Sequence, residues 1–104
     1  MREIESDIRQ LLEKTERTRV QFLQVELQTC LTALDMAKHE LEIGHIEVAA
    51  RELLALKKGI ATMHRFIPEM REDARRAELE WRLVELEAAC QPFEQALQAH
   101  RHGG

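Results

Sequence analysis

The residues best able to do chemistry gather in one polar stretch, residues 39–47. Imidazole nitrogens and carboxylate oxygens alternate there, and both are ligands that zinc and iron accept. Glu42 and His45 even have the Glu-x-x-His spacing of di-iron helical bundles. That motif needs both side chains on one inward helix face, whereas Gly44 lies between them and is expected to end the helix. The motif also needs a second copy and further buried carboxylates, which the sequence lacks. A solvated polar turn is therefore favoured over a metal site.

Other catalytic signatures are missing from the sequence. The single serine, Ser6, has no histidine and aspartate at a recognised triad spacing, and no glycine-rich loop suits a phosphate group. His39 and Glu40 are not followed by a histidine at the zinc-protease spacing. We therefore assign no catalytic, cofactor-binding or metal-binding residue and expect no cofactor. Whether the protein is an enzyme stays open, with a non-enzymatic role favoured.

Cys30 and Cys90 are expected to be free, buried thiols, because each falls among regularly spaced apolar residues. With turns near residues 44–45 and 67, Cys30 on the first helix would lie level with residue 59 on the second helix. Residue 59 would in turn lie level with residue 75 on the third helix. Cys90 would then lie about 22 Å away along the bundle. A disulfide needs Cα atoms within about 7 Å, so no bond between the two is predicted.

Composition excludes several classes of protein. The chain has 104 residues, which suits one domain spanning 1–104. Four glycines and two prolines supply too few turns for a many-stranded β fold. The net charge is −4 with both signs interleaved, whereas nucleic-acid binders present a basic face, so nucleic acid is disfavoured as a partner.

The apolar runs are short. The longest, Leu53–Leu56, falls far below the about 20 residues that span a membrane. The first residues also lack the apolar core of a signal peptide. The sequence therefore predicts a cytoplasmic protein with no membrane partner.

Apolar residues recur every three or four positions and predict a first helix that ends at Gly44. Its stripe is Leu23, Leu27, Cys30, Leu34, Ala37 and Leu41. Ile4, Ile8 and Leu11 begin a similar pattern, but Thr15 and Thr18 take its next positions. Thr18 and Gln21 match a capping box. Two alternatives follow: one long helix, or a short arm over about 3–14 and a main helix over about 18–42.

The same spacing predicts a second helix over 46–66, in which Gly59 and Ala61 would allow close approach of a neighbouring helix. Pro68 favours a turn and a third helix over about 68–99, with one long helix kinked at Pro68 as the alternative. Pro92 is expected to kink or restart that third helix. Leu34, Leu53 and Trp81, each mid-stripe in a different helix, are the expected core residues.

The third helix carries two apolar stripes on nearly opposite faces. The alanine-rich stripe around Trp81 is expected to face the core, because alanines permit close helix approach. The leucine-rich stripe would then face outward and mediate self-association as a dimer. Its members are Leu79, Leu83, Leu86, Cys90, Phe93 and Leu97. Alternatively, the segment from Ile4 to Leu12 folds over that stripe and keeps the protein monomeric.

Taken together, the sequence predicts an all-α antiparallel bundle of three main helices with coiled-coil-like packing. The favoured function is a non-enzymatic helical interaction or structural module, an oligomeric adapter or regulatory protein with a protein partner. The alternative is a small metal-binding or enzymatic bundle that uses the polar turn around residues 39–47.

Overall fold

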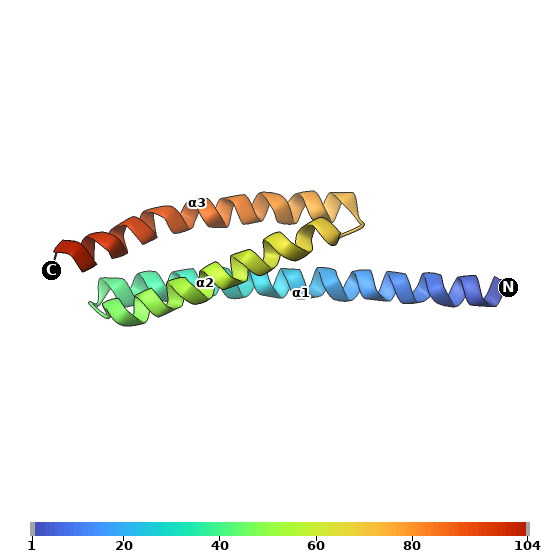
Figure 1. Cartoon of the computed structure of the whole chain (residues 1–104), viewed down its shortest axis with the longest axis horizontal. Helices are drawn as coiled ribbons and strands as arrows, with labels where there is room; N and C mark the ends of the chain where they lie inside the picture. Colours follow the sequence, from blue (N-terminus) through green and yellow to red (C-terminus); the bar gives the residue numbers. More distant parts are fainter. Residues whose placement is uncertain (1, 104) are drawn as a thin grey trace.

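The computed structural model is a three-helix bundle, and it describes the backbone of residues 2–103 and the side chains of residues 7, 10, 11 and 13–102 (Figure 1). Helix α1 spans Arg2–Glu42, α2 spans Ile46–Phe66 and α3 spans Asp73–Gly103. A single 3₁₀ turn, η1 (Ile67–Glu69), lies between α2 and α3. Neighbouring helices run antiparallel, so the predicted fold class is confirmed.

Helix α1 is one continuous helix of 41 residues, and the long-helix alternative is correct. The hydroxyls of Thr15 and Thr18 donate to the carbonyls of Leu11 and Lys14, both at 2.9 Å. Thr18 therefore does not cap a helix start, and the predicted capping box and separate arm are wrong. The charged residues of this segment are strong helix formers, so nothing in it interrupts the backbone hydrogen bonds.

The connection between α1 and α2 is a Schellman turn at Gly44, as the sequence predicts. Gly44 adopts a φ of 86°, a left-handed conformation that side chains rarely tolerate. The N–H of His45 donates to the carbonyl of Glu40 at 2.8 Å, and the N–H of Gly44 to that of Leu41 at 3.1 Å. These bonds satisfy the last carbonyls of α1.

Pro68 marks a true turn, which confirms that prediction over the kinked-helix alternative. It lies at the start of η1, after which Met70 is extended with a ψ of 139°. Helix α3 begins at Asp73 rather than at 68 and continues past 99 to Gly103. Pro92 lies inside α3 without ending it, and the C-terminal part of the helix bends (Figure 1).

Each helix contributes one apolar stripe to a single core. Leu34 and Leu53 belong to it, as predicted. Helix α1 contributes its predicted stripe together with Val20. Met63 of α2, and Ile67 and Met70 of the turn, are also fully enclosed.

The two faces of α3 are reversed relative to the prediction. Trp81 is 63 % exposed and Val84 59 % exposed, so the expectation that Trp81 lies in the core is wrong. The six proposed interface residues are buried in the chain's own core and are not available as an outward surface: Leu79, Leu83, Leu86, Cys90, Phe93 and Leu97. Leucine and phenylalanine side chains bury far more apolar area than alanines, and the free energy gained by burial scales with that area. This gain outweighs the closer helix approach that alanines permit.

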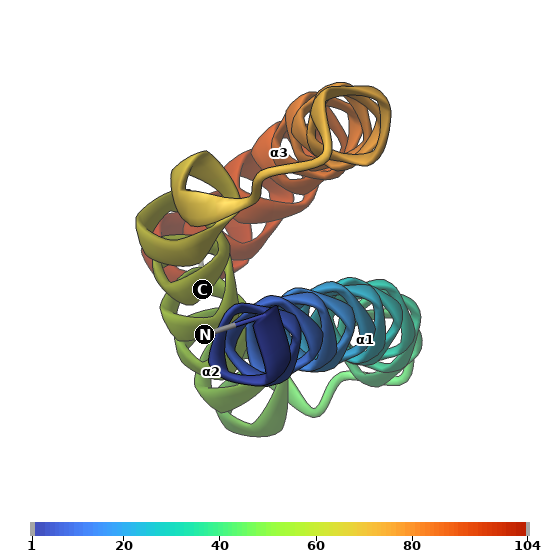
Figure 2. The same cartoon turned by 90° about the vertical axis from the view of Figure 1, so that its right-hand side faces the viewer.

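Seen along the bundle, α1 and α3 both pack against α2 and diverge from each other (Figure 2). The molecule is 69 Å long and only 20 by 16 Å across. The N-terminal part of α1 extends beyond the other two helices (Figure 1). None of the described helices combines the length and the apolar character needed to span a membrane.

Gly59 of α2 packs directly against side chains of α1. A Cβ atom added at Gly59 would stand 2.5 Å from Sγ of Cys30 and 2.8 Å from Oε1 of Glu26. The predicted close approach is therefore confirmed at Gly59, but not at Ala61, which is exposed.

The register between α2 and α3 differs from the prediction. Lys57 forms an ion pair with Glu94, and His64 with Glu87, so the level of Gly59 corresponds to about residue 92 rather than 75. Cys30 and Cys90 consequently lie near the same level of the bundle, and the 22 Å separation was wrong. The connection that was expected to be a turn near residue 67 consists of η1 and residues 70–72, and α3 begins only at Asp73, which shifts the register. Both cysteines are free and buried.

Candidate functional site

The polar turn around residues 39–47 does not assemble a cluster of ligands. Nδ1 of His45 lies 2.7 Å from Oε2 of Glu40, while Glu42 and Glu47 are exposed. Glu47 instead reaches Arg101 at the end of α3, at 3.5 Å. Among the described residues, no group of three or more histidine, cysteine, aspartate or glutamate side chains is placed to hold a metal ion. The turn is a solvated connection in which one hydrogen bond, between His45 and Glu40, joins two of its side chains.

The two cysteines are poor nucleophiles in this environment. Burial, the neighbouring Glu26 carboxylate and Cys90 raise the pKa of the Cys30 thiol to about 11. Burial also raises the pKa of Cys90, with Glu94 and Glu87 adding to the effect. Because the thiolate is the reactive form, both side chains are protonated and unreactive near neutral pH.

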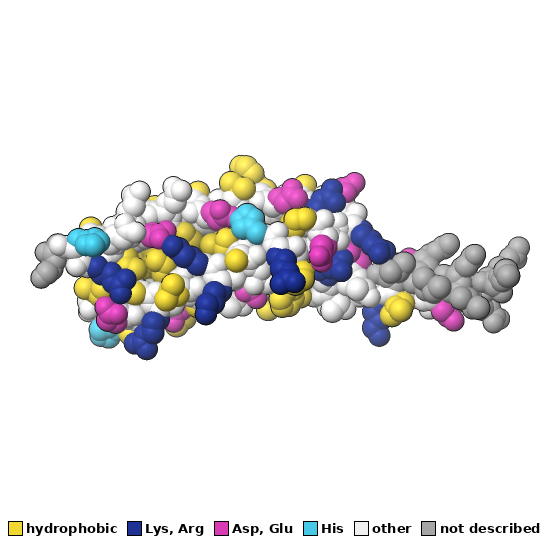
Figure 3. Space-filling model, in the orientation of Figure 1, with side chains coloured by type: hydrophobic (Ala, Val, Ile, Leu, Met, Phe, Trp, Pro, Cys, Tyr) yellow, Lys and Arg dark blue, Asp and Glu magenta, His cyan; other side chains and the backbone are white. Residues whose placement is uncertain are grey.

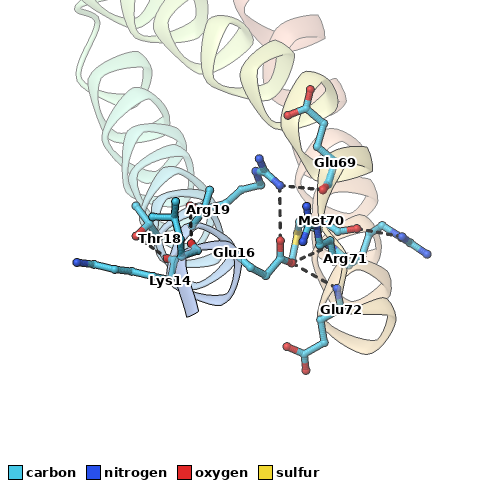
Figure 4. Close-up of polar contacts among 11 residues, drawn as sticks. Lys14, Glu16, Thr18, Arg19, Glu69, Met70, Arg71 and Glu72 are labelled. Carbon is cyan, nitrogen blue, oxygen red and sulfur yellow. Dashed lines mark hydrogen bonds and ion pairs between the residues drawn. The ribbon is translucent and has the colours of Figure 1, made fainter. Parts of the chain in front are cut away.

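A polar cluster joins α1 to the turn between α2 and α3 (Figure 4). Oε1 of Glu16 accepts hydrogen bonds from the backbone N–H groups of Arg71 at 2.8 Å and Glu72 at 3.3 Å. Nη1 of Arg19 donates to the carbonyl of Glu69 at 2.9 Å and lies 3.5 Å from Oε2 of Glu16. Three of these contacts satisfy backbone groups of the turn and the fourth is an ion pair within α1, so the cluster is structural rather than a binding site.

Helix α1 has a second row of residues, on the side away from the core, which we call the outer stripe. Its ten members follow one another in alternating steps of four and three residues, and every one is exposed. Val25 is 65 % exposed and Leu11 64 %, and together with Phe22 and Met36 they form a row of exposed apolar side chains rather than isolated ones. The outer stripe consists of Leu11, Thr15, Thr18, Phe22, Val25, Thr29, Thr32, Met36, His39 and Ile43.

Two shallow grooves lie end to end along the outer stripe. The first has a volume of about 590 Å³ and runs from Leu11 to Phe22, with Phe66 of α2 at its side. The second, of about 420 Å³, runs from Val25 to Met36, with Glu52 of α2 at its side. Phe22 and Phe66 meet edge to face, with ring centroids 6.4 Å apart. Both grooves are mostly apolar, and each has one residue of α2 at its side.

The sequence analysis noted the start of this pattern at Ile4, Ile8 and Leu11 but did not follow it past Thr15 and Thr18. The same spacing continues through these threonines to Phe22 and Val25. A threonine presents a methyl group as well as a hydroxyl, so the three-and-four spacing alone was the signal that could have revealed the outer stripe.

A third groove, of about 310 Å³, lies between α2 and α3. The ion pair Lys57–Glu94 and the contact between Arg101 and Glu47 span it. Figure 3 shows apolar side chains gathered at this end of the bundle, with charged side chains of both signs among them. Because its charged groups already pair across the cleft, this groove serves to join α2 to α3.

Comparison of the chain with protein-family models, with curated proteins and with solved structures gave no match.

Proposed function

We propose that this protein is a non-enzymatic helical interaction module, an oligomeric adapter or regulatory protein, whose docking surface is the outer stripe of α1. The observation that carries the proposal is the unbroken row of ten exposed residues with coiled-coil spacing. Large apolar side chains in such a row are costly to leave in water, and a partner helix is the usual way to cover them.

The alternative, a metal-binding or enzymatic bundle using the polar turn, has less support. In the polar turn His45 and Glu40 pair with each other, and Glu47 reaches Arg101 of α3 instead of joining them. Metal analysis of protein purified without a tag addresses it: a stoichiometric bound metal would favour the alternative.

A photo-crosslinking amino acid placed at residue 25 tests the interaction surface in the cells that make the protein. Val84 is the matched control, because it is nearly as exposed but lies on α3. We expect discrete adducts from position 25, absent from position 84 and lost when Met36→Glu is added on the same stripe. The same adducts from both positions, or none from either, would contradict the proposal.

A further inference from the structure

We infer that the occupant of the outer stripe is a second copy of this chain, with the two α1 helices packed side by side in antiparallel orientation. This inference rests on the proposed function and adds the partner and its orientation. Three observations on α1 carry it: the spacing of the stripe, the charges along its edges and the order of its large and small residues.

The spacing is that of a coiled-coil seam. Alternating steps of four and three residues give an average of 3.5 residues, the repeat that keeps one row of a helix facing a partner helix. From Leu11 to Ile43 the row spans about 48 Å at 1.5 Å per residue. A two-fold axis across the middle of the outer stripe lets the same stripe cover itself.

The charges beside the stripe select the orientation. Along one edge Lys14 lies near the start of α1, and Asp35 and Glu42 lie near its end, all exposed. Along the other edge Arg19 is followed by Glu26, whose carboxylate lies beside Gly59 of α2, and by Glu40. An antiparallel pair places Lys14 of each helix near Glu42 of the second copy, so that opposite charges meet at both ends of the pair. In a parallel pair, a residue on one edge of the stripe faces the residue five positions later on the opposite edge of the second copy. Lys14 would then face Arg19 of the second copy, and Asp35 would face Glu40. Both contacts bring like charges together and are repulsive.

The order of side-chain sizes favours the same arrangement. When the axis passes near residue 27, Met36 lies opposite Thr18 of the second copy, Phe22 opposite Thr32, and Val25 opposite Thr29. Each of these layers pairs a large side chain with a small one, which fills space evenly. A parallel pair would stack Phe22 on Phe22 and Thr29 on Thr29, which leaves crowded and empty layers in alternation.

The threonines near the start of the stripe are compatible with burial. The hydroxyls of Thr15 and Thr18 already donate to backbone carbonyls four residues earlier. Covering these side chains therefore leaves no hydroxyl donor without a partner, which is the main cost of burying such a group.

Light scattering on the purified full-length protein at high micromolar concentration gives the first test. We expect a dimer that the double substitution Phe22→Glu, Val25→Glu converts to a monomer with unchanged helix content by circular dichroism. The control Trp81→Glu, Val84→Glu changes an equally exposed pair on α3 and should remain dimeric. A monomeric wild-type protein, or a dimer lost only with the α3 pair, would overturn the inference.

Charge exchange tests the orientation. In the antiparallel pair Lys14→Glu places two acids together at each end, so at low ionic strength it should weaken dimerisation about tenfold. Adding Glu42→Lys to the same chain restores opposite charges and should recover the affinity. In a parallel pair Lys14→Glu would instead remove the repulsion with Arg19 and strengthen the dimer, and that result would refute the orientation.

Different experimental results would refute the self-pairing and the proposed function. If the wild-type protein is a monomer but position 25 gives adducts with another protein in cells, only the self-pairing is wrong. If it is a monomer and position 25 gives no adduct, both are wrong.

Discussion

Glu16 and Arg71 are 55 positions apart in the sequence, yet the carboxylate of Glu16 accepts a hydrogen bond from the backbone N–H of Arg71. Glu16 lies in the segment of α1 that has no apolar residue, and only 14 % of its side chain is exposed. Arg71 lies between η1 and α3, where the first N–H groups of a helix have no partner within that helix. A side chain of α1 thus stabilises the turn that begins α3.

Replacing Glu16 by alanine should lower the free energy of unfolding by about 1–2 kcal/mol, the range for losing a charged side chain that accepts hydrogen bonds from backbone N–H groups at a helix start. Glu16→Gln keeps an acceptor oxygen and should lose less. The matched control is Glu13→Ala, an exposed glutamate one turn earlier. Urea unfolding measures all three. Equal midpoints for Glu16→Ala and Glu13→Ala would show that the cap contributes nothing.

Gly59→Ala should destabilise the bundle although alanine is the better helix former. The added methyl group meets Sγ of Cys30 at 2.5 Å, and overpacking of this kind costs about 1–3 kcal/mol, against a gain of about 1 kcal/mol in helix propensity. In the background of Cys30→Ala the sulfur is gone, and the added methyl fills the space it leaves. A double-mutant cycle should therefore show the pair losing clearly less stability than the sum of the single changes. Additive losses would mean that the two residues do not touch.

Local signals in the sequence predicted the helices and the turns at Gly44 and Pro68, because a helix end depends on the backbone preferences of one or two residues. They did not predict which face of α3 is buried, since both faces carry apolar residues and the choice depends on the total area that packing removes from water. The cap by Glu16 and the level of Cys90 were also missed. Both depend on how α3 is placed relative to α1 and α2, and residues 70–72, between η1 and α3, determine that placement. The outer stripe was missed because its threonines were not recognised as members of the pattern, although they continue its spacing of three and four residues.

Because α3 buries the face opposite to the expected one, two residues of this helix should differ sharply in how much they contribute to stability. Leu86 is 1 % exposed, and Leu86→Ala should cost about 2–5 kcal/mol of stability, because it leaves a cavity in the core. Trp81→Ala, at a position 63 % exposed, should change stability by less than about 0.5 kcal/mol. Chemical denaturation of the two variants distinguishes the faces directly. A larger loss for Trp81→Ala would restore the arrangement that the sequence alone suggested.

The raised pKa of Cys30 predicts that the bundle loses stability in alkaline solution. Below about pH 9 the thiol is protonated in both the folded and the unfolded chain, so its contribution is constant. Between about pH 9 and pH 11 the unfolded thiol ionises while the folded thiol keeps its proton, because its pKa is about 11. The unfolded state then binds fewer protons, and the free energy of unfolding must fall as pH rises, by roughly 2 kcal/mol across this window. Because other side chains also ionise in alkaline solution, the comparison with Cys30→Ala isolates the contribution of the thiol. We expect urea midpoints of the wild-type protein to decline more steeply with pH than those of Cys30→Ala. Parallel declines would mean that the folded environment of Cys30 does not resist ionisation.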